Sequence, residues 1–248
     1  MKLSNKIKNL DKIKNKFRVP HFLVFKVKDY LKNPNLIHNT CLSKFKTKVI
    51  IRSSYSEEDS IKSMAGKFTS VANIDIKKKE IFFKSIKNVI NSYKKNKLKQ
   101  HFFIQEMISD SKISGVVFTI EPGTGFPLTT INFSQGRNTD LITSGTQNGF
   151  TYKYLNSFKF LRDDYFIKKI DKISNKLKKT LNKSNLDIEF AISKKSGLNI
   201  LQVREINKYK KINHSQVYKT YRLLEKKLDK ILKEKSFLKG DRTFFSTM

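Results

Sequence analysis

The chain has 248 residues, a formal net charge of +31 and a single cysteine, Cys41. The length excludes a disulfide-dependent miniprotein and allows one large domain or two small ones with a sizeable core. One cysteine cannot form an internal disulfide, and no Cys/His spacing is typical of a zinc site. No apolar run approaches the ~18–20 residues of a membrane span, and residues 1–16 lack the apolar stretch of a secretory signal. We therefore expect a cytoplasmic protein.

The charge itself suggests a nucleic acid or an acidic membrane surface as partner. Lysine, however, supplies 45 of the 52 basic residues, and arginine is the usual reader of bases and of bidentate phosphates. The lysines are also scattered among asparagines and isoleucines, which share A/T-rich codons. We interpret most of the excess as a solvated surface and expect no specific nucleic acid, while binding to a polyanion stays open as an alternative.

The first half of the chain alternates short β segments with one amphipathic helix. We expect a helix over 80–99, with Ile81, Ile86, Ile90 and Tyr93 at helical spacing. A Pro-Gly turn is expected at 122–125 and a loop over 136–149. The expected strands span 48–52, 102–107, 115–120 and 129–133.

The second half begins with a helix that Asp163 or Asp164 is expected to cap, with an apolar stripe reaching Leu181. Two alternating segments, 186–192 and 198–204, then predict an antiparallel hairpin. A basic helix is expected from Ser215 to Lys235. Sheets with interleaved helices in this order indicate an α+β fold.

The hairpin places unusual polar side chains on facing strands. Asp187, Glu189 and Ala191 are expected on one face of the first strand. One face of the second strand is expected to carry Leu198, Ile200, Gln202 and Arg204. Carboxylate and amide oxygens suit Mg²⁺, and a guanidinium suits phosphate. A polar, solvent-facing edge hairpin explains the same pattern about equally well.

A second candidate site follows the strand over 48–52. Arg52 stands at the strand end before two serines, and the small Ala65-Gly66 step precedes Lys67. Such a segment can approach a polyphosphate closely. By spacing alone, an ordinary exit from a strand into a loop is the favoured alternative.

Four ordered motifs over about 150 residues resemble phosphoenolpyruvate synthase and pyruvate phosphate dikinase. They are Ile50–Ser54 with Glu58-Asp59 and Ser63–Gly66, Ile104–Ile108, Ser114–Pro122, and Asp187–Ala191 with Leu201–Arg204. The resemblance implies an ATP-grasp fold, in which two α+β lobes hold ATP between antiparallel sheets flanked by helices. It implies ATP and Mg²⁺ as ligands.

Carried over residue by residue, the resemblance implies roles for ten positions. Arg52 and Arg204 would be the catalytic residues, holding the phosphates. Glu189 and Gln202 would bind Mg²⁺. Lys6 would be the lysine that reaches ATP, with Lys8 as a competitor because the glycines of that element are absent. The remaining nucleotide contacts would come from Gly66 and Lys67 in a phosphate-covering loop, Ser70, Gln105 and the backbone at Met107.

Residues 131–145 look more like capsule-cluster relatives that include L-glutamine kinases. In such relatives a later domain carries the phosphoryl group on a histidine. None of the four histidines here has a phosphohistidine-like context, and His101 is expected to be structural. We expect residues 1–207 to form the ATP-grasp domain and 208–248 a basic helical linker toward a missing domain.

The expected function is therefore the Mg-ATP-binding domain of a dikinase-type phosphotransferase, an incomplete ATP-dependent kinase. The acceptor would be a small metabolite such as pyruvate or L-glutamine, engaged by the absent domain. Two alternatives remain. One is a non-catalytic basic protein that binds nucleic acid or an acidic surface. The other is a degenerate fragment that binds ATP without transferring phosphate.

Overall fold

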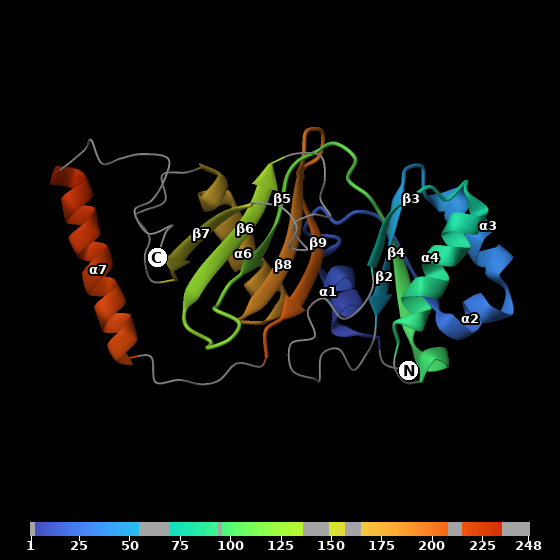
Figure 1. Ribbon diagram of the computed structural model, residues 1–248, viewed down its shortest axis with the longest axis horizontal. Helices are drawn as coiled ribbons and strands as arrows, with labels where there is room; N and C mark the ends of the chain where they lie inside the picture. The colour runs from blue at the N-terminus through green and yellow to red at the C-terminus, as the bar shows by residue number, and fades with distance from the viewer. Residues whose placement is uncertain are drawn as a thin grey trace. The chain divides into compact units, whose positions relative to one another are not determined.

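The computed structural model describes residues 3–54, 70–93, 96–135, 149–156, 165–207 and 215–234. The chain divides into two units, residues 1–209 and residues 210–248. The second unit contributes the helix α7 (Ser215–Glu234), as the sequence predicts. The other helices and strands of the described residues belong to the first unit (Figure 1).

A four-stranded antiparallel sheet forms the first lobe, in the order β1-β4-β2-β3. Its strands are β1 (Phe22–Lys26), β2 (Val49–Ser54), β3 (Ser70–Ile74) and β4 (His101–Glu106). One face is covered by α2 (Val27–Lys32), α3 (Pro34–Lys44) and α4 (Lys79–Asn91) (Figure 1). Alternating apolar residues bury this face, so that Ile51, Phe82 and Phe102 are fully enclosed in the core of the lobe.

A five-stranded antiparallel sheet forms the second lobe, in the order β7-β6-β5-β8-β9. Its strands are β5 (Ser111–Phe118), β6 (Leu128–Gln135), β7 (Phe150–Leu155), β8 (Leu186–Ser193) and β9 (Gly197–Glu205). Its apolar face packs against α6 (Tyr165–Leu181) and α1 (Asn5–Ile13). The core stripe of α6 follows helical spacing, as the sequence predicts, with Ile167, Ile170, Leu177 and Leu181 buried.

Gly115 lies where β5 passes closest to its neighbours. A Cβ built there would stand 2.3 Å from the backbone oxygen of Asn132 on β6 and 2.9 Å from the ring of Phe190 on β8. The two flanking strands can approach β5 this closely only because residue 115 has no side chain.

The helix expected over 80–99 is shorter than predicted. It ends at Asn91, and a separate 3-10 turn covers Lys97–Lys99 after the left-handed residue Asn96. The prediction also placed Ile81 on the buried stripe, but its side chain is 47% exposed. Phe82 is buried in its place. Two expectations lie outside the described residues: the cap of α6 at residue 163 or 164, and the loop over residues 136–148.

The expected fold class is confirmed: the chain is α+β, with two lobes whose antiparallel sheets are flanked by helices. This is the arrangement implied by the resemblance to ATP-grasp domains. His101 begins β4 and is buried, in keeping with a structural role. Within the described part of the chain, every helix is too short or too polar to cross a membrane.

Candidate nucleotide and metal site

The register of the four-stranded sheet gathers three predicted site residues on one face. Arg52 on β2 lies opposite Ser70 on β3 and Phe103 on β4, so Arg52, Ser70 and Phe103 share a face. Gln105 lies two residues beyond Phe103 on β4 and therefore points the same way. Phe103 packs into the core of the second lobe, so this face is turned toward the five-stranded sheet.

The polar face of the five-stranded sheet carries the other predicted residues. Asp187 pairs with Arg204, and Glu189 pairs with Gln202, across β8 and β9. Directly opposite residues project to the same side of a sheet, so these four side chains form one patch. We call them, together with Arg52, the carboxylate–arginine cluster.

A β-bulge at Leu201 creates this patch. Because of it, the prediction of which β9 residues share a face was wrong. The partner of Glu189 is Gln202, whereas the partner of Phe190 is Ile200, so Leu201 is the extra residue. Leu198 and Ile200 were predicted to share a face with Gln202 and Arg204. Because a bulge inverts the alternation, they instead point with Phe190 into the apolar core.

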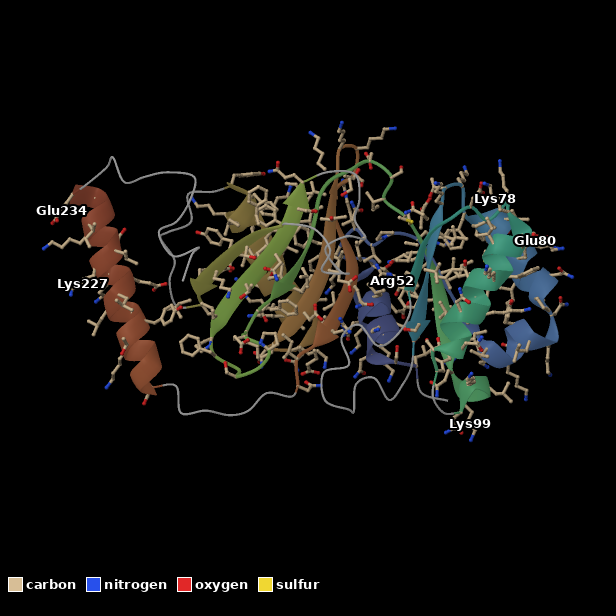
Figure 2. The ribbon with its side chains drawn as sticks, viewed as in Figure 1. Arg52, Lys78, Glu80, Lys99, Lys227 and Glu234 are labelled. Carbon is tan, nitrogen blue, oxygen red and sulfur yellow. The ribbon has the colours of Figure 1, made fainter. Side chains whose placement is uncertain are left out.

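One contact of the cluster connects the two sheets, and two more lie within the five-stranded sheet. Arg52 Nη1 donates to Glu189 Oε2 over 2.9 Å, and Gln202 Nε2 donates to Glu189 Oε1 over 3.0 Å. Arg204 Nη2 lies 2.9 Å from Asp187 Oδ2. Figure 2 shows Arg52 on β2, on the side nearer β8 and β9. Each carboxylate is thus held by an arginine.

Three further hydrogen bonds fix the lobes around the cluster. Gln105 Nε2 donates to the backbone oxygen of the bulged residue Leu201 over 3.2 Å. Asn9 on α1 donates to the backbone oxygen of Val203 over 3.0 Å. Ser4 Oγ, next to α1, lies 2.5 Å from Ser54 Oγ at the end of β2. The cluster is therefore bordered by β2, β4, β9 and the N-terminal helix.

The placement of α1 separates the two candidate lysines. Lys6 is buried, with 6% of its surface exposed, and its positive charge acts on both Asp187 and Glu189. Lys8 is only partly buried. Of the two, Lys6 is the one that the structure brings to the carboxylates.

The pKa values of the two carboxyl groups are shifted in opposite directions. Burial alone would raise the pKa of Glu189, but the charges of Arg52 and Arg204 and the hydrogen bond from Arg52 outweigh it, so this pKa is lowered. Burial raises the pKa of Asp187, the negative charge of Glu189 adds to this, and Arg204 only partly offsets it. Glu189 is accordingly the firmly ionised ligand of the pair.

Several polar atoms near the cluster are buried without a hydrogen-bond partner among the described residues. They include the acceptors Asp187 Oδ1 and Gln105 Oε1 and the donor Arg52 Nε. Buried polar atoms are rarely left unpaired in folded proteins, so these atoms suit a ligand that offers both a cation and anionic oxygens.

The donor set fits Mg²⁺ held with a phosphate. Within the described ranges no group of three or more His, Cys, Asp or Glu side chains could hold a metal ion. The cluster contains two carboxylates and one amide group, from Asp187, Glu189 and Gln202, and both carboxylates are held by arginines. Mg²⁺ typically takes one or two carboxylates and completes its shell with water and substrate phosphates.

The remaining predicted residues differ in their placement. Ser70 is exposed on the same face as Arg52. Met107 follows β4 and is partly buried, and its sulfur accepts a hydrogen bond from the backbone N–H of Asn73 over 3.0 Å. Gly66 and Lys67 lie outside the described residues, so their expected role in a phosphate-covering loop stays a prediction.

Asp187 and Asn9 join the site without having been predicted as site residues. The sequence placed Asp187 on the same face as Glu189, but only Glu189 was assigned to the site. Asn9 gave no signal, since its role depends on the packing of α1 against β9, which no local pattern specifies.

No protein-family model matches the chain, and no curated protein is significantly similar to it. Solved structures similar to it include the D-alanine-D-alanine ligase from Coxiella burnetii, with a TM-score of 0.48 and 13% identity over 82% of this chain and 48% of that one. The VanG D-Ala:D-Ser ligase from Enterococcus faecalis has a TM-score of 0.46 and is 13% identical over 82% of this chain and 52% of that one. The D-alanine-D-alanine ligase from Helicobacter pylori has a TM-score of 0.46 and is 10% identical over 82% of this chain and 54% of that one. The chain thus spans about half the length of each of these structures.

Proposed function

We propose that residues 1–207 form an ATP-grasp domain that binds Mg-ATP and serves a dikinase-type phosphotransferase. One observation carries the proposal: two arginines and two carboxylates, supplied by facing sheets, meet in the buried carboxylate–arginine cluster. Such a group is costly to bury unless each charge is paired, and it contains the chemical groups that a metal–triphosphate complex requires.

In the proposed complex each residue has one task. Arg52 and Arg204 hold phosphate oxygens, and Lys6 adds a third positive charge beside them. Glu189 and Gln202 bind Mg²⁺, which would neutralise charge that develops on the phosphates. Phosphoryl transfer depends mainly on such positioning and charge stabilisation.

The adenine end is assigned to Gln105 and the chain at Met107, with Ser70 nearby on β3. The unpaired Gln105 Oε1 supports this assignment, because the exocyclic amino group of adenine is a donor that could satisfy it. Gly66 and Lys67 complete the proposed site from the phosphate side.

The finer identity follows the four motifs that resemble phosphoenolpyruvate synthase and pyruvate phosphate dikinase. On this proposal the phosphoryl group passes to a histidine on a further domain and then to a small metabolite, such as pyruvate or L-glutamine. Residues 208–248 would lead toward that domain.

Calorimetric titration of ATP with Mg²⁺ tests the ATP site. Arg204→Ala and Glu189→Ala are each expected to weaken binding by roughly 1.5–3 kcal/mol, because each removes a charged contact. Arg222→Ala, on α7, is the matched control and should bind like the parent chain. Unchanged affinity in both site variants would refute the site.

The net charge of +31 favours one competing function, binding to a nucleic acid or another polyanion. That function predicts an affinity that falls steeply with salt, because counterion release would drive binding. Titration of a DNA duplex at two salt concentrations distinguishes it from the ATP site. The third possibility, a degenerate domain, predicts ATP binding without phosphoryl transfer when a histidine-bearing phosphotransferase domain is added in trans.

A further inference from the structure

The ion pair between Arg52 and Glu189 occupies the groups that the two proposed ligands need. Arg52 holds one oxygen of Glu189, and the amide nitrogen of Gln202 holds the other. Both side chains of the ion pair are nearly buried, with relative exposures of 11% and 12%. A cation at Glu189 must therefore compete with the hydrogen bonds from Arg52 and Gln202, and a phosphate at Arg52 must compete with the carboxylate of Glu189.

The orientation of Gln202 strengthens this point. An ionised carboxylate only accepts hydrogen bonds, so the amide group that faces Glu189 must be the NH₂. The amide oxygen, which is the metal ligand, is consequently turned away from that carboxylate. Gln202 has to rotate its amide before both side chains can coordinate one cation.

Charge opposes the arrival of the cation alone. Arg52, Arg204 and Lys6 place three positive charges around two carboxylates, so an added divalent cation would be repelled. A displaced Arg52 would also be left buried without an anion, which is a costly state. A triphosphate that arrives with the cation supplies the missing anion.

We propose that Arg52 and Glu189 mask each other, so that the metal ion and the triphosphate each bind more tightly when the other is present. On binding, Glu189 exchanges Arg52 for the cation, and Arg52 exchanges Glu189 for a phosphate oxygen. Arg52 is thus a positioning residue for the metal as well as a phosphate ligand. This inference rests on the proposed Mg-ATP site, and it adds a coupling between the two halves of that site.

The first test measures Mn²⁺, as a spectroscopic substitute for Mg²⁺, in the absence of nucleotide. Arg52→Gln removes the mask from Glu189, so we expect it to bind Mn²⁺ about ten- to a hundredfold more tightly than the parent chain. A residue with a merely structural role would lower this affinity when replaced. The control, Arg222→Gln on α7, makes the same change in charge and is expected to leave Mn²⁺ binding unchanged.

The second test is the reciprocal one and uses a substitution that preserves shape. Glu189→Gln removes the anion that competes for Arg52, so metal-free ATP, measured with a chelator present, is expected to bind more tightly than to the parent chain. The further gain that Mn²⁺ gives the parent chain should be lost. This arm keeps the proposal testable if Arg52→Gln does not fold.

The outcomes separate the two proposals. If the parent chain binds no Mn-ATP, the proposed function fails. If it binds Mn-ATP, but neither variant gains affinity for its single ligand, the site stands and the masking is overturned. A gain in both variants, together with weaker binding of the complete Mn-ATP complex, supports the masking.

Discussion

Gly115 is the position where a single methyl group has the largest expected effect on stability. A Cβ there would overlap the backbone oxygen of Asn132, which cannot rotate away as a side chain could. We expect Gly115→Ala to lower the free energy of unfolding by about 1–3 kcal/mol or more, measured by urea denaturation.

Gly123→Ala provides the comparison for that measurement. Its new Cβ would stand 3.3 Å from the carboxylate of Glu121, which is the end of a flexible side chain. We expect a loss of no more than about 0.5 kcal/mol. Equal losses at the two glycines would contradict the packing explanation for Gly115.

His101 gives the chain a pH-dependent stability. Burial lowers its pKa below the ordinary value of 6.5, and the positive charge of Lys26, opposite it on β1, acts in the same direction. The unfolded chain therefore binds a proton that the folded chain resists, and the free energy of unfolding falls as the pH drops through 6.5. It stops falling below the lowered pKa.

Thermal unfolding followed from about pH 7.5 to 5 checks this expectation. His101→Gln should show a shallower decline than the parent chain over that range, because the titrating group is gone. A decline of the same steepness in both proteins would assign the effect to other groups.

At the scale of elements, the periodicity of apolar residues predicted regular strands and helices, but it missed irregularities within them. The pairing of β8 with β9 was predicted from their alternation, and so was the stripe of α6. The bulge at Leu201 broke the alternation, although the sequence holds its trace: the apolar positions Ile200 and Val203 are three residues apart, an odd step for a strand. That step could have shown that Gln202 and Arg204 project from the other face of β9 than Ile200.

Other elements carried too little pattern to be predicted. The strand β3 is five residues long and contains the left-handed Asn73, and β1 is a partly buried run beside the lobe interface. The helix α1 lies in a lysine-rich segment that resembles a solvated surface. It is nonetheless anchored, because Ile7, Leu10 and Ile13 are buried in the core of the second lobe.

At the scale of the whole molecule, residues 1–209 form one unit and residues 210–248 another. The site residues and both cores lie in the first unit. We expect a chain that ends after Tyr209 to unfold cooperatively, within a few degrees of the parent melting temperature, and to keep its affinity for Mg-ATP.

Differential scanning calorimetry and ATP titration of the truncated chain test this. The control is a chain that begins after Ile13 and so lacks α1, which should lose stability because three core side chains are removed. A truncated chain that melts far earlier than the parent would show that residues 210–248 are needed for the fold.

The hydrogen bond between Asn9 and Val203 joins residues 194 positions apart. During synthesis α1 leaves the ribosome long before β9, its binding surface, which is among the last parts of this unit to be made. The apolar side chains of α1 must therefore wait, exposed, until nearly the whole first unit has emerged. Contacts of such high sequence separation slow folding. The abundant lysines around those side chains would keep the waiting segment in solution.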